Sequence, residues 1–306
     1  MRAWLPAYVL LALIWGNSFV FIKIGETALT PAGVVFSRLF LGMLTMLAIS
    51  LVMRSPLPPR RYWKRMFIAA FLMTSGGWLC FAFAEQYVSS ALAGIMNGST
   101  PLLTLVAILI AFPEEKPTPQ RIAGLILGFS GVLIVIGVWN GLGGGTLLGI
   151  GACLLAVVGY GIAYPYVRRH LATGDSALGP MTFATGLMIM GTLQITPVML
   201  VTGYAHASIT WQVVASMLAL GILGSGIAYI LNFMIIHRSD ATTASTVTYV
   251  ITLVAVVSGA VILGEHITWN EPVGGALIVL GAAIAQGLVR LPVRARSEGS
   301  GRMGAP

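Results

Sequence analysis

Residues 75–91 read SGGWLCFAFAEQYVSSA, and residues 225–241 read SGIAYILNFMIIHRSDA. The two stretches lie 150 positions apart and share the opening Ser-Gly pair, one phenylalanine, one serine and the final alanine. The same offset relates a second group of residues, Glu115, Thr118, Gly124 and Gly131, to Glu265, Thr268, Gly274 and Gly281. We therefore predict that each half of the chain is one copy of a structural repeat.

The composition predicts a protein that is embedded in a lipid bilayer. Apolar residues make up 57% of the 306 residues, charged residues make up 8%, and the mean hydropathy is +0.92. Such a chain has too little polar surface for a water-soluble globule. We predict an all-α polytopic membrane protein with ten transmembrane helices, placed by apolar length at residues 4–22, 31–53, 63–85, 90–112, 120–139, 146–167, 177–202, 211–236, 241–263 and 269–290.

Five spans in each half predict that the two repeats are inverted. An odd number of crossings leaves the chain on the opposite side of the membrane, so the second copy starts where the first did not. Many secondary transporters have this architecture. We place the first five-helix repeat at residues 1–140, the second at 141–291, and a disordered cytoplasmic tail at 292–306.

The positive charges fall on one side of this ten-span arrangement. Lys23 follows the first span and Arg38 lies inside the second, and the other Lys and Arg residues fall in alternate loops or at the termini: Arg2, Arg54, Arg60, Arg61, Lys64, Arg65, Lys116, Arg121, Arg168, Arg169, Arg238, Arg290, Arg294, Arg296 and Arg302. The bias toward cytoplasmic cations predicts a multi-pass protein of the cell inner membrane with both termini in the cytoplasm. Nucleic acid is not needed to explain the net charge of +8.

The motifs of membrane enzymes are missing from the sequence. It contains no HExxH or GxSxG motif and no nucleotide-binding loop, so we expect neither an enzyme nor direct ATP hydrolysis. We predict no cofactor and no metal, and Cys80 and Cys153, both inside spans, imply no disulfide framework. A channel or a structural helix bundle without carrier activity stays open as an alternative, although no ring of charges or filter signature is visible.

Four features of the chain resemble the drug/metabolite transporter superfamily, most closely its EamA-type exporters. They are LIWGNSFVFIK at residues 13–23, Arg38, Pro101 and GEHIT at residues 264–268. The resemblance implies a ten-helix exporter of amino acids or related small metabolites. It also implies a central cavity lined by helices one, three, four, six, eight and nine, with helices five and ten at the periphery. The ninth span departs from the pattern, since Val250-Ile251 stands where the family usually has a proline.

Polar groups in the fourth span mark a candidate binding site. Pro101 has no amide hydrogen to donate to the carbonyl of Asn97, so a kink there exposes a backbone acceptor beside Asn97 and Thr100. A substrate amine could use this acceptor. Alternatively, Ser and Thr side chains or a neighbouring helix satisfy it.

Other spans carry aromatic and polar side chains at helical spacing. The eighth span has Ser225, Tyr229 and Asn232 on one face, and the ninth has Thr242, Thr246 and Tyr249. Interhelical hydrogen bonding and aromatic packing explain some of these residues equally well. We predict that the small-molecule solute contacts the following residues around one cavity near the bilayer centre: Trp15, Asn17, Trp78, Asn97, Thr100, Tyr160, Tyr164, Tyr229, Asn232 and Tyr249.

Arg38 is the cation placed well inside a span, and Glu85 near the end of the next span is its expected counter-ion. We predict an intramembrane ion pair between them, because an unpaired charge in hydrocarbon is costly. Two functional alternatives stay open, namely binding of a substrate carboxylate and proton coupling. The sequence does not separate proton antiport from facilitated diffusion.

Overall fold

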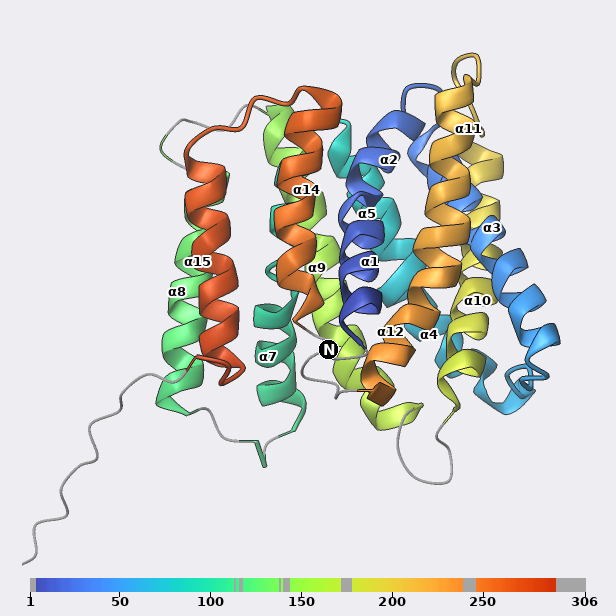
Figure 1. Cartoon of the computed structure of the whole chain (residues 1–306), viewed down its shortest axis with the longest axis horizontal. Helices are drawn as coiled ribbons and strands as arrows, with labels where there is room; N and C mark the ends of the chain where they lie inside the picture. The colour runs from blue at the N-terminus through green and yellow to red at the C-terminus, as the bar shows by residue number, and fades with distance from the viewer. Residues whose placement is uncertain are drawn as a thin grey trace, which may run out of the picture.

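The computed structural model describes residues 4–112, 114–115, 118–137, 139, 144–171, 178–238 and 246–289. Within these residues the regular structure is helical, apart from an isolated antiparallel bridge between Leu29 and Ala205. Most of the helices run side by side along one direction (Figure 1). The described part of the structure thereby confirms the all-helical class.

Several spans are built from more than one helical segment. The segments in chain order are α1 (Leu5–Gly16), α2 (Ser18–Gly25), α3 (Pro31–Val52), η1 (Arg60–Tyr62), α4 (Trp63–Ala70), η2 (Phe71–Ser75), α5 (Gly76–Glu85), α6 (Ser90–Asn97), α7 (Thr100–Ala111), α8 (Pro119–Ile136), α9 (Gly144–His170), α10 (Pro180–Thr202), α11 (Trp211–Leu218), η5 (Ala219–Ile227), α12 (Ala228–Arg238), α14 (Val247–Leu263) and α15 (Asn270–Ala285).

Within the described residues, eight helical stretches are long and apolar enough to cross a membrane, and the apolar helices α14 and α15 are shorter, at 17 and 16 residues. The ninth span was expected from residue 241, and residues 241–245 lie outside the described part of the chain, as does the predicted tail. The tenth was expected to reach residue 290, but α15 ends at Ala285, and Gly287 follows with a φ of 78°. A left-handed residue of this kind favours glycine and ends a helix.

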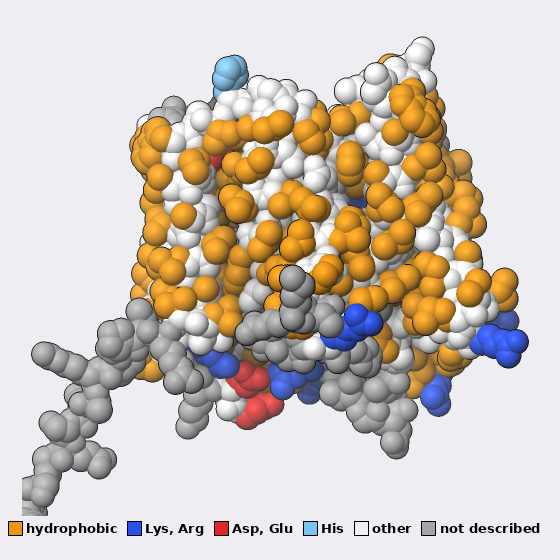
Figure 2. All heavy atoms as spheres, in the orientation of Figure 1, with side chains coloured by type: hydrophobic (Ala, Val, Ile, Leu, Met, Phe, Trp, Pro, Cys, Tyr) orange, Lys and Arg blue, Asp and Glu red, His pale blue; other side chains and the backbone are white. Residues whose placement is uncertain are grey.

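The outer surface fits a bilayer. Large apolar side chains on many helices face outward, and Leu51, Val52 and Val201 are each at least 80% exposed. Figure 2 shows apolar side chains over the body of the molecule, with Lys and Arg gathered along one end. We call this the basic end, where α8 and α4 begin and α9 and α12 finish, and the opposite one the far end.

The repeated Ser-Gly pair produces the same local structure in both halves. In each copy the helix widens into a π-helical segment at the pair. The segment η2 ends at the serine of the first pair, and η5 runs across the second pair. The Ser75 and Ser225 hydroxyls donate to carbonyls five residues back, on Ala70 and Leu220. Such π-helical turns re-aim backbone groups and often lie at functional sites.

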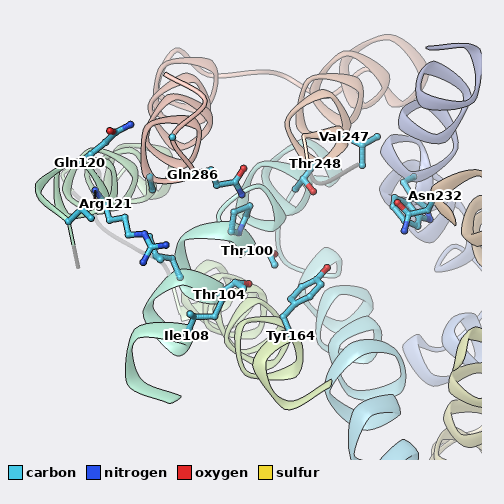
Figure 3. Close-up of a pocket in the computed structure, with 16 residues that line it drawn as sticks. Thr100, Thr104, Ile108, Gln120, Arg121, Tyr164, Asn232, Val247, Thr248 and Gln286 are labelled. Carbon is cyan, nitrogen blue, oxygen red and sulfur yellow. Dashed lines mark hydrogen bonds between the residues drawn. The ribbon is translucent and has the colours of Figure 1, made fainter. Parts of the chain in front are cut away.

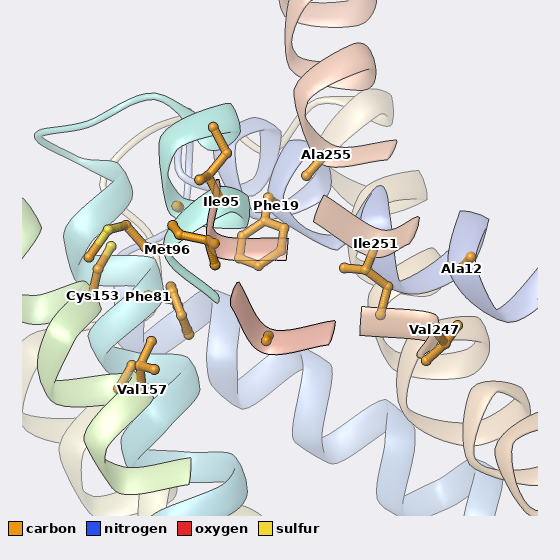
Figure 4. Close-up of a cluster of buried hydrophobic side chains, with 14 of the residues drawn as sticks. Ala12, Phe19, Phe81, Ile95, Met96, Cys153, Val157, Val247, Ile251 and Ala255 are labelled. Atoms are coloured by element: carbon orange, nitrogen blue, oxygen red, sulfur yellow. The ribbon is translucent and has the colours of Figure 1, made fainter. Parts of the chain in front are cut away.

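A buried apolar cluster joins the two halves. Figure 4 shows Phe19, Phe81 and Ile95 of the first half directed toward the same region as Ile251 and Ala255 of the second. Helix α1 packs against α12 and α14, and α3 packs against η5 and α10. The halves therefore form one interleaved bundle.

Helices α8 and α15 stand together at the edge of the bundle (Figure 1), as the resemblance implied for helices five and ten. Their backbones touch at glycines that the 150-residue offset makes equivalent. A Cβ on Gly124 would lie 2.5 Å from the carbonyl oxygen of Gly281, and one on Gly131 would lie 2.6 Å from that of Gly274. The offset makes Gly124 equivalent to Gly274, and Gly131 equivalent to Gly281. The contact between Gly124 and Gly281 is therefore the counterpart of the contact between Gly274 and Gly131, as at a two-fold axis.

Gly281→Ala should destabilise the fold, because the new Cβ would overlap the amide nitrogen of Gly128 in the facing backbone. We expect a loss of about 1–3 kcal/mol, typical of overpacking, seen as a lower unfolding temperature of the purified protein in detergent. Gly151→Ala in α9 is the matched control, since nothing lies within 4 Å of the added carbon. Equal unfolding temperatures for the two variants would contradict the close glycine contact.

Candidate functional site

A cavity of about 170 Å³ lies between the two halves of the chain. We call it the deep cavity, and its lining consists of Trp15, Ser18, Phe19, Ile22, Arg38, Met73, Trp78, Phe81, Asn97, Thr100, Tyr160, Tyr164, Tyr229, Thr248 and Ile251. The first, third, fourth, sixth, eighth and ninth spans all contribute, as the resemblance implied. Arg38 adds the second span.

A second cavity of about 530 Å³ reaches the basic end, and we call it the mouth cavity. Figure 3 shows Thr104, Tyr164, Thr248 and Gln286 arranged around this space. Four residues line both cavities, so the two spaces adjoin: Trp15, Thr100, Tyr164 and Thr248. The remaining lining of the mouth cavity is Pro101, Thr104, Leu105, Ile108, Thr118, Gln120, Arg121, Asn232, Val247, Ala285, Gln286 and Gly287.

Arg38 is held rigidly in the wall of the deep cavity. Its guanidinium carbon lies 3.7 Å from the centre of the Trp78 ring, and its Nε donates to Ser225 Oγ at 3.2 Å. Gly42 allows this approach of α3 to η5, because a Cβ there would lie 2.7 Å from the Cβ of Ser225. The π-helical turn therefore supplies the acceptor that orients the guanidinium.

The predicted ion pair between Arg38 and Glu85 is not formed. Among the described residues the ion pairs are Arg121 and Arg168 with Glu115, and neither oxygen of the fully buried Glu85 carboxyl has a hydrogen-bond partner. The aromatic face of Trp78, rather than the Glu85 carboxylate, packs against one side of the Arg38 guanidinium. Lys23 lies near Glu85, but its ammonium donates to the backbone carbonyls of Glu85 and Val88.

Trp15 links the first span to the second half of the chain. Its Nε1 donates to the carbonyl of Gly224 at 3.0 Å, which the π-helical geometry of η5 leaves accessible. Its ring also packs edge-on against Tyr229, with the ring centres 6.1 Å apart. Trp15 and Tyr229 thus form one aromatic wall of the deep cavity.

The fourth span is interrupted before Pro101, as predicted, and α6 ends at Asn97. The carbonyl of Asn97 has a hydrogen-bond donor within the chain, because Thr100 Oγ1 donates to its oxygen at 2.7 Å. The alternative in which a hydroxyl satisfies the kink is therefore the one observed. The ninth span, which lacks the proline, runs as one helix from Val247, and Ile251 at the equivalent position lines the deep cavity.

Eight of the ten predicted site residues line one or both cavities: Trp15, Trp78, Asn97, Thr100, Tyr160, Tyr164, Tyr229 and Asn232. Asn17 and Tyr249 do not. The Asn17 amide donates to the carbonyl of Leu13 in its own helix, and the Tyr249 hydroxyl donates to Gln286. On the ninth span the cavity is lined instead by Thr248 and Ile251.

Sequence reasoning also missed Ser18, Thr104, Gln120, Arg121 and Gln286 as cavity residues. Ser18 lies three residues after Trp15, and Thr104 lies four after Thr100, so the same helical faces were available as a signal. Gln120 and Gln286 lie at the ends of α8 and α15, which the resemblance placed at the periphery. Only the tertiary structure brings those ends to the mouth cavity.

Hydrogen bonds join the two halves at the far end. The Glu265 carboxylate, in the loop after α14, accepts hydrogen bonds from Ser90 N at 2.7 Å, Ala91 N at 3.0 Å and Ser90 Oγ at 3.0 Å. Thr30 Oγ1 donates to the carbonyl of Gly203 at 2.7 Å. We call this set, Glu265 with Ser90 and Ala91, and Thr30 with Gly203, the far-end contacts.

The basic end carries a different electrostatic arrangement. Arg168 donates to Glu115 at 2.9 Å, and Arg121, which lines the mouth cavity, reaches the same carboxylate at 3.4 Å. The hydrogen bond from Arg168 keeps the pKa of the Glu115 carboxyl below its usual range. The group is therefore ionised at neutral pH and tethers the start of α8 to the end of α9.

These features define a class, namely an all-helical membrane protein with adjoining solute-sized cavities between its two halves. The chain belongs to the EamA-like transporter family, whose family model matches residues 2–137 and again residues 147–286. The protein is thus a transporter, and the family match covers both halves.

Individual relatives are similar along most of their length. An uncharacterized transporter of Archaeoglobus fulgidus is 26% identical, covering 88% of this chain and 92% of its own. A probable terminal-alkyne amino-acid exporter of Streptantibioticus cattleyicolor is 27% identical, covering 91% of each. One solved crystal structure, at 18% identity, matches 94% of this chain and 99% of its own with a TM-score of 0.66, which shows the fold alone.

Proposed function

We propose that the protein is a secondary transporter that exports amino acids or related small metabolites by alternating access. The observation that carries the proposal is the asymmetry of the two ends. The mouth cavity reaches the basic end, whereas the far-end contacts join the halves at the other. A carrier needs a cavity that opens to one side at a time.

The moving parts in this proposal are two inverted five-helix repeats, residues 1–140 and 141–291, with ten spans. The reciprocal glycine contacts between α8 and α15 support a two-fold relation between them. In the proposed cycle the far-end contacts break and the mouth cavity closes, so the solute is exposed to the other side. No catalytic residue enters this cycle.

The proposed orientation places the basic end and both termini in the cytoplasm, supported by the clustering of cations. In a variant without the native cysteines, Ala207→Cys between α10 and α11 should react with a membrane-impermeant maleimide added to intact cells. Leu57→Cys, which is 55% exposed at the basic end, should react only after the cells are opened. The reverse pattern would overturn the orientation.

The proposed solute class and direction rest on the relatives and on the lining of the cavities. One relative carries the name of an amino-acid exporter. Aromatic faces suit the apolar part of an amino acid or its ammonium group, and Asn97 and Asn232 offer amide donors and acceptors without fixed charge.

Proton coupling through Glu85 is a further part of the proposal. The Glu85 carboxyl is fully buried and has no hydrogen-bond partner within the described part of the chain, so holding a proton avoids a costly buried charge. Glu26, one residue beyond the first span, lies close enough to Glu85 for the two carboxyl groups to interact electrostatically. Burial raises the pKa of Glu26 to about 8, and the positive charge of Lys23 opposes this shift. These acids lie toward the far end, where an exporter would take up protons from outside.

Transport by purified protein in liposomes tests the proposal. We expect saturable counterflow of at least one labelled amino acid, and faster net transport when a pH gradient is imposed. Glu85→Gln should keep counterflow and lose the response to the gradient, while Glu114→Gln at the basic end serves as the control. Solute flux without counterflow would favour a channel, and no flux of any amino acid would overturn the proposed solute class.

A further inference from the structure

Arg38 has no acidic partner among the residues that the structure describes. The side chain is 7% exposed, lies within a membrane span, and makes no ion pair among the described residues. A buried guanidinium without an anion is costly, so a position of this kind requires a compensating group. The Trp78 face compensates in part, on one side of the guanidinium plane.

The terminal nitrogens of Arg38 are the atoms left for a ligand. Nε is occupied by Ser225 Oγ, and no hydrogen bond from either terminal nitrogen is found within the described residues. Arg38 nevertheless lines the deep cavity. A guanidinium presents its two terminal N–H groups in a planar fork, which matches the two oxygens of a carboxylate.

The charge of the two cavities favours the same ligand. Their described lining includes two cations, Arg38 and Arg121, and no Asp or Glu. A solute carrying only positive charge would meet repulsion here, whereas an anion would gain electrostatic energy in a space of low dielectric. The neighbouring rings of Trp15, Tyr160 and Tyr229 would cover an apolar or aromatic solute body.

We propose that Arg38 is the carboxylate-binding residue of the deep cavity, and that the transported solutes are small carboxylates with an apolar or aromatic body, amino acids among them. This inference rests on the proposed function, because it concerns the solute of the same cavities. It also assigns Ser225 as the positioning residue that sets the plane of the guanidinium.

Binding of a matched ligand series tests the assignment. The probes are 3-phenylpropanoate, its amide 3-phenylpropanamide, phenethylamine and L-phenylalanine, measured by calorimetry on purified native protein. We expect the two carboxylates to bind about tenfold to a hundredfold more tightly than the amide, the range for losing a hydrogen-bonded charge pair. The amine should bind more weakly than L-phenylalanine.

Variants separate Arg38 from the rest of the cavity. Arg38→Gln should bind the carboxylate and the amide equally. Arg38→Lys should show an intermediate preference for the carboxylate, since it keeps the charge without the planar fork. The control Arg169→Gln, at an exposed position, should keep the native preference. Ser225→Ala should reduce the preference without abolishing it. If Arg38→Gln does not fold, the ligand series on native protein still decides.

Two results of the binding measurements would overturn the inference: native protein that binds the amide as tightly as the carboxylate, or folded Arg38→Gln that keeps the preference. Counterflow of neutral or cationic solutes with no carboxylate among them would refute the role of Arg38 and leave the carrier intact. Absence of counterflow with every solute would instead refute the proposed function.

Discussion

Thr248→Trp should slow transport at least about tenfold while leaving the protein folded and in the membrane. Thr248 lines both the deep and the mouth cavity, so an indole at this position would fill the passage between them. We expect the initial rate of counterflow to fall about tenfold or more, which corresponds to at least about 1.4 kcal/mol. The measurement is counterflow in liposomes at matched protein content.

The matched control is Leu253→Trp on the same helix. Leu253 is 64% exposed on the outer surface of α14, where a Trp would meet lipid. It introduces the same side chain into the same helix without entering either cavity, so its rate should stay near the native value. Native rates for Thr248→Trp, at normal abundance, would show that solute does not pass between the two cavities.

Glu265→Ala should shift the protein toward a conformation that is open at the far end. Its carboxylate accepts three hydrogen bonds from the start of α6, and these join the two halves. Hydrogen bonds to a charged group contribute about 1.5–3 kcal/mol each. Losing the equivalent of even one would change the balance between the two conformations about tenfold.

Side-specific labelling of a cavity residue measures this shift. In a protein without the native cysteines, Ser18→Cys places a thiol in the deep cavity, where Ser18 is 5% exposed. We expect an impermeant maleimide to reach it mainly from the basic end in the parent, and several-fold faster from the far end after Glu265→Ala. Glu114→Ala, an exposed acid at the basic end, is the control. Unchanged far-end labelling, with the unfolding temperature preserved, would mean that Glu265 does not hold this end closed.

The contact of Glu265 with the start of α6 could not be predicted from the sequence. The GEHIT stretch supported a family resemblance, but nothing in it indicated that its acid would bind the start of α6, because that contact joins residues 175 positions apart. Long-range contacts of this kind depend on how whole helices pack, which local patterns do not encode.

The sequence by itself determined the membrane class, the family, the helical content and the interruption at Pro101, because hydropathy, charge bias and the missing proline amide act locally. Eight of its ten predicted site residues line the cavities, since a polar or aromatic group within a span must face protein or water. Only the tertiary structure decided that Thr248 rather than Tyr249 faces the cavity, and that Arg38 meets Trp78 and Ser225 instead of Glu85. Helical spacing fixes which side chains share a face, whereas the direction of that face depends on the rotation of each helix against its neighbours, which here follows from glycine contacts and π-helical turns.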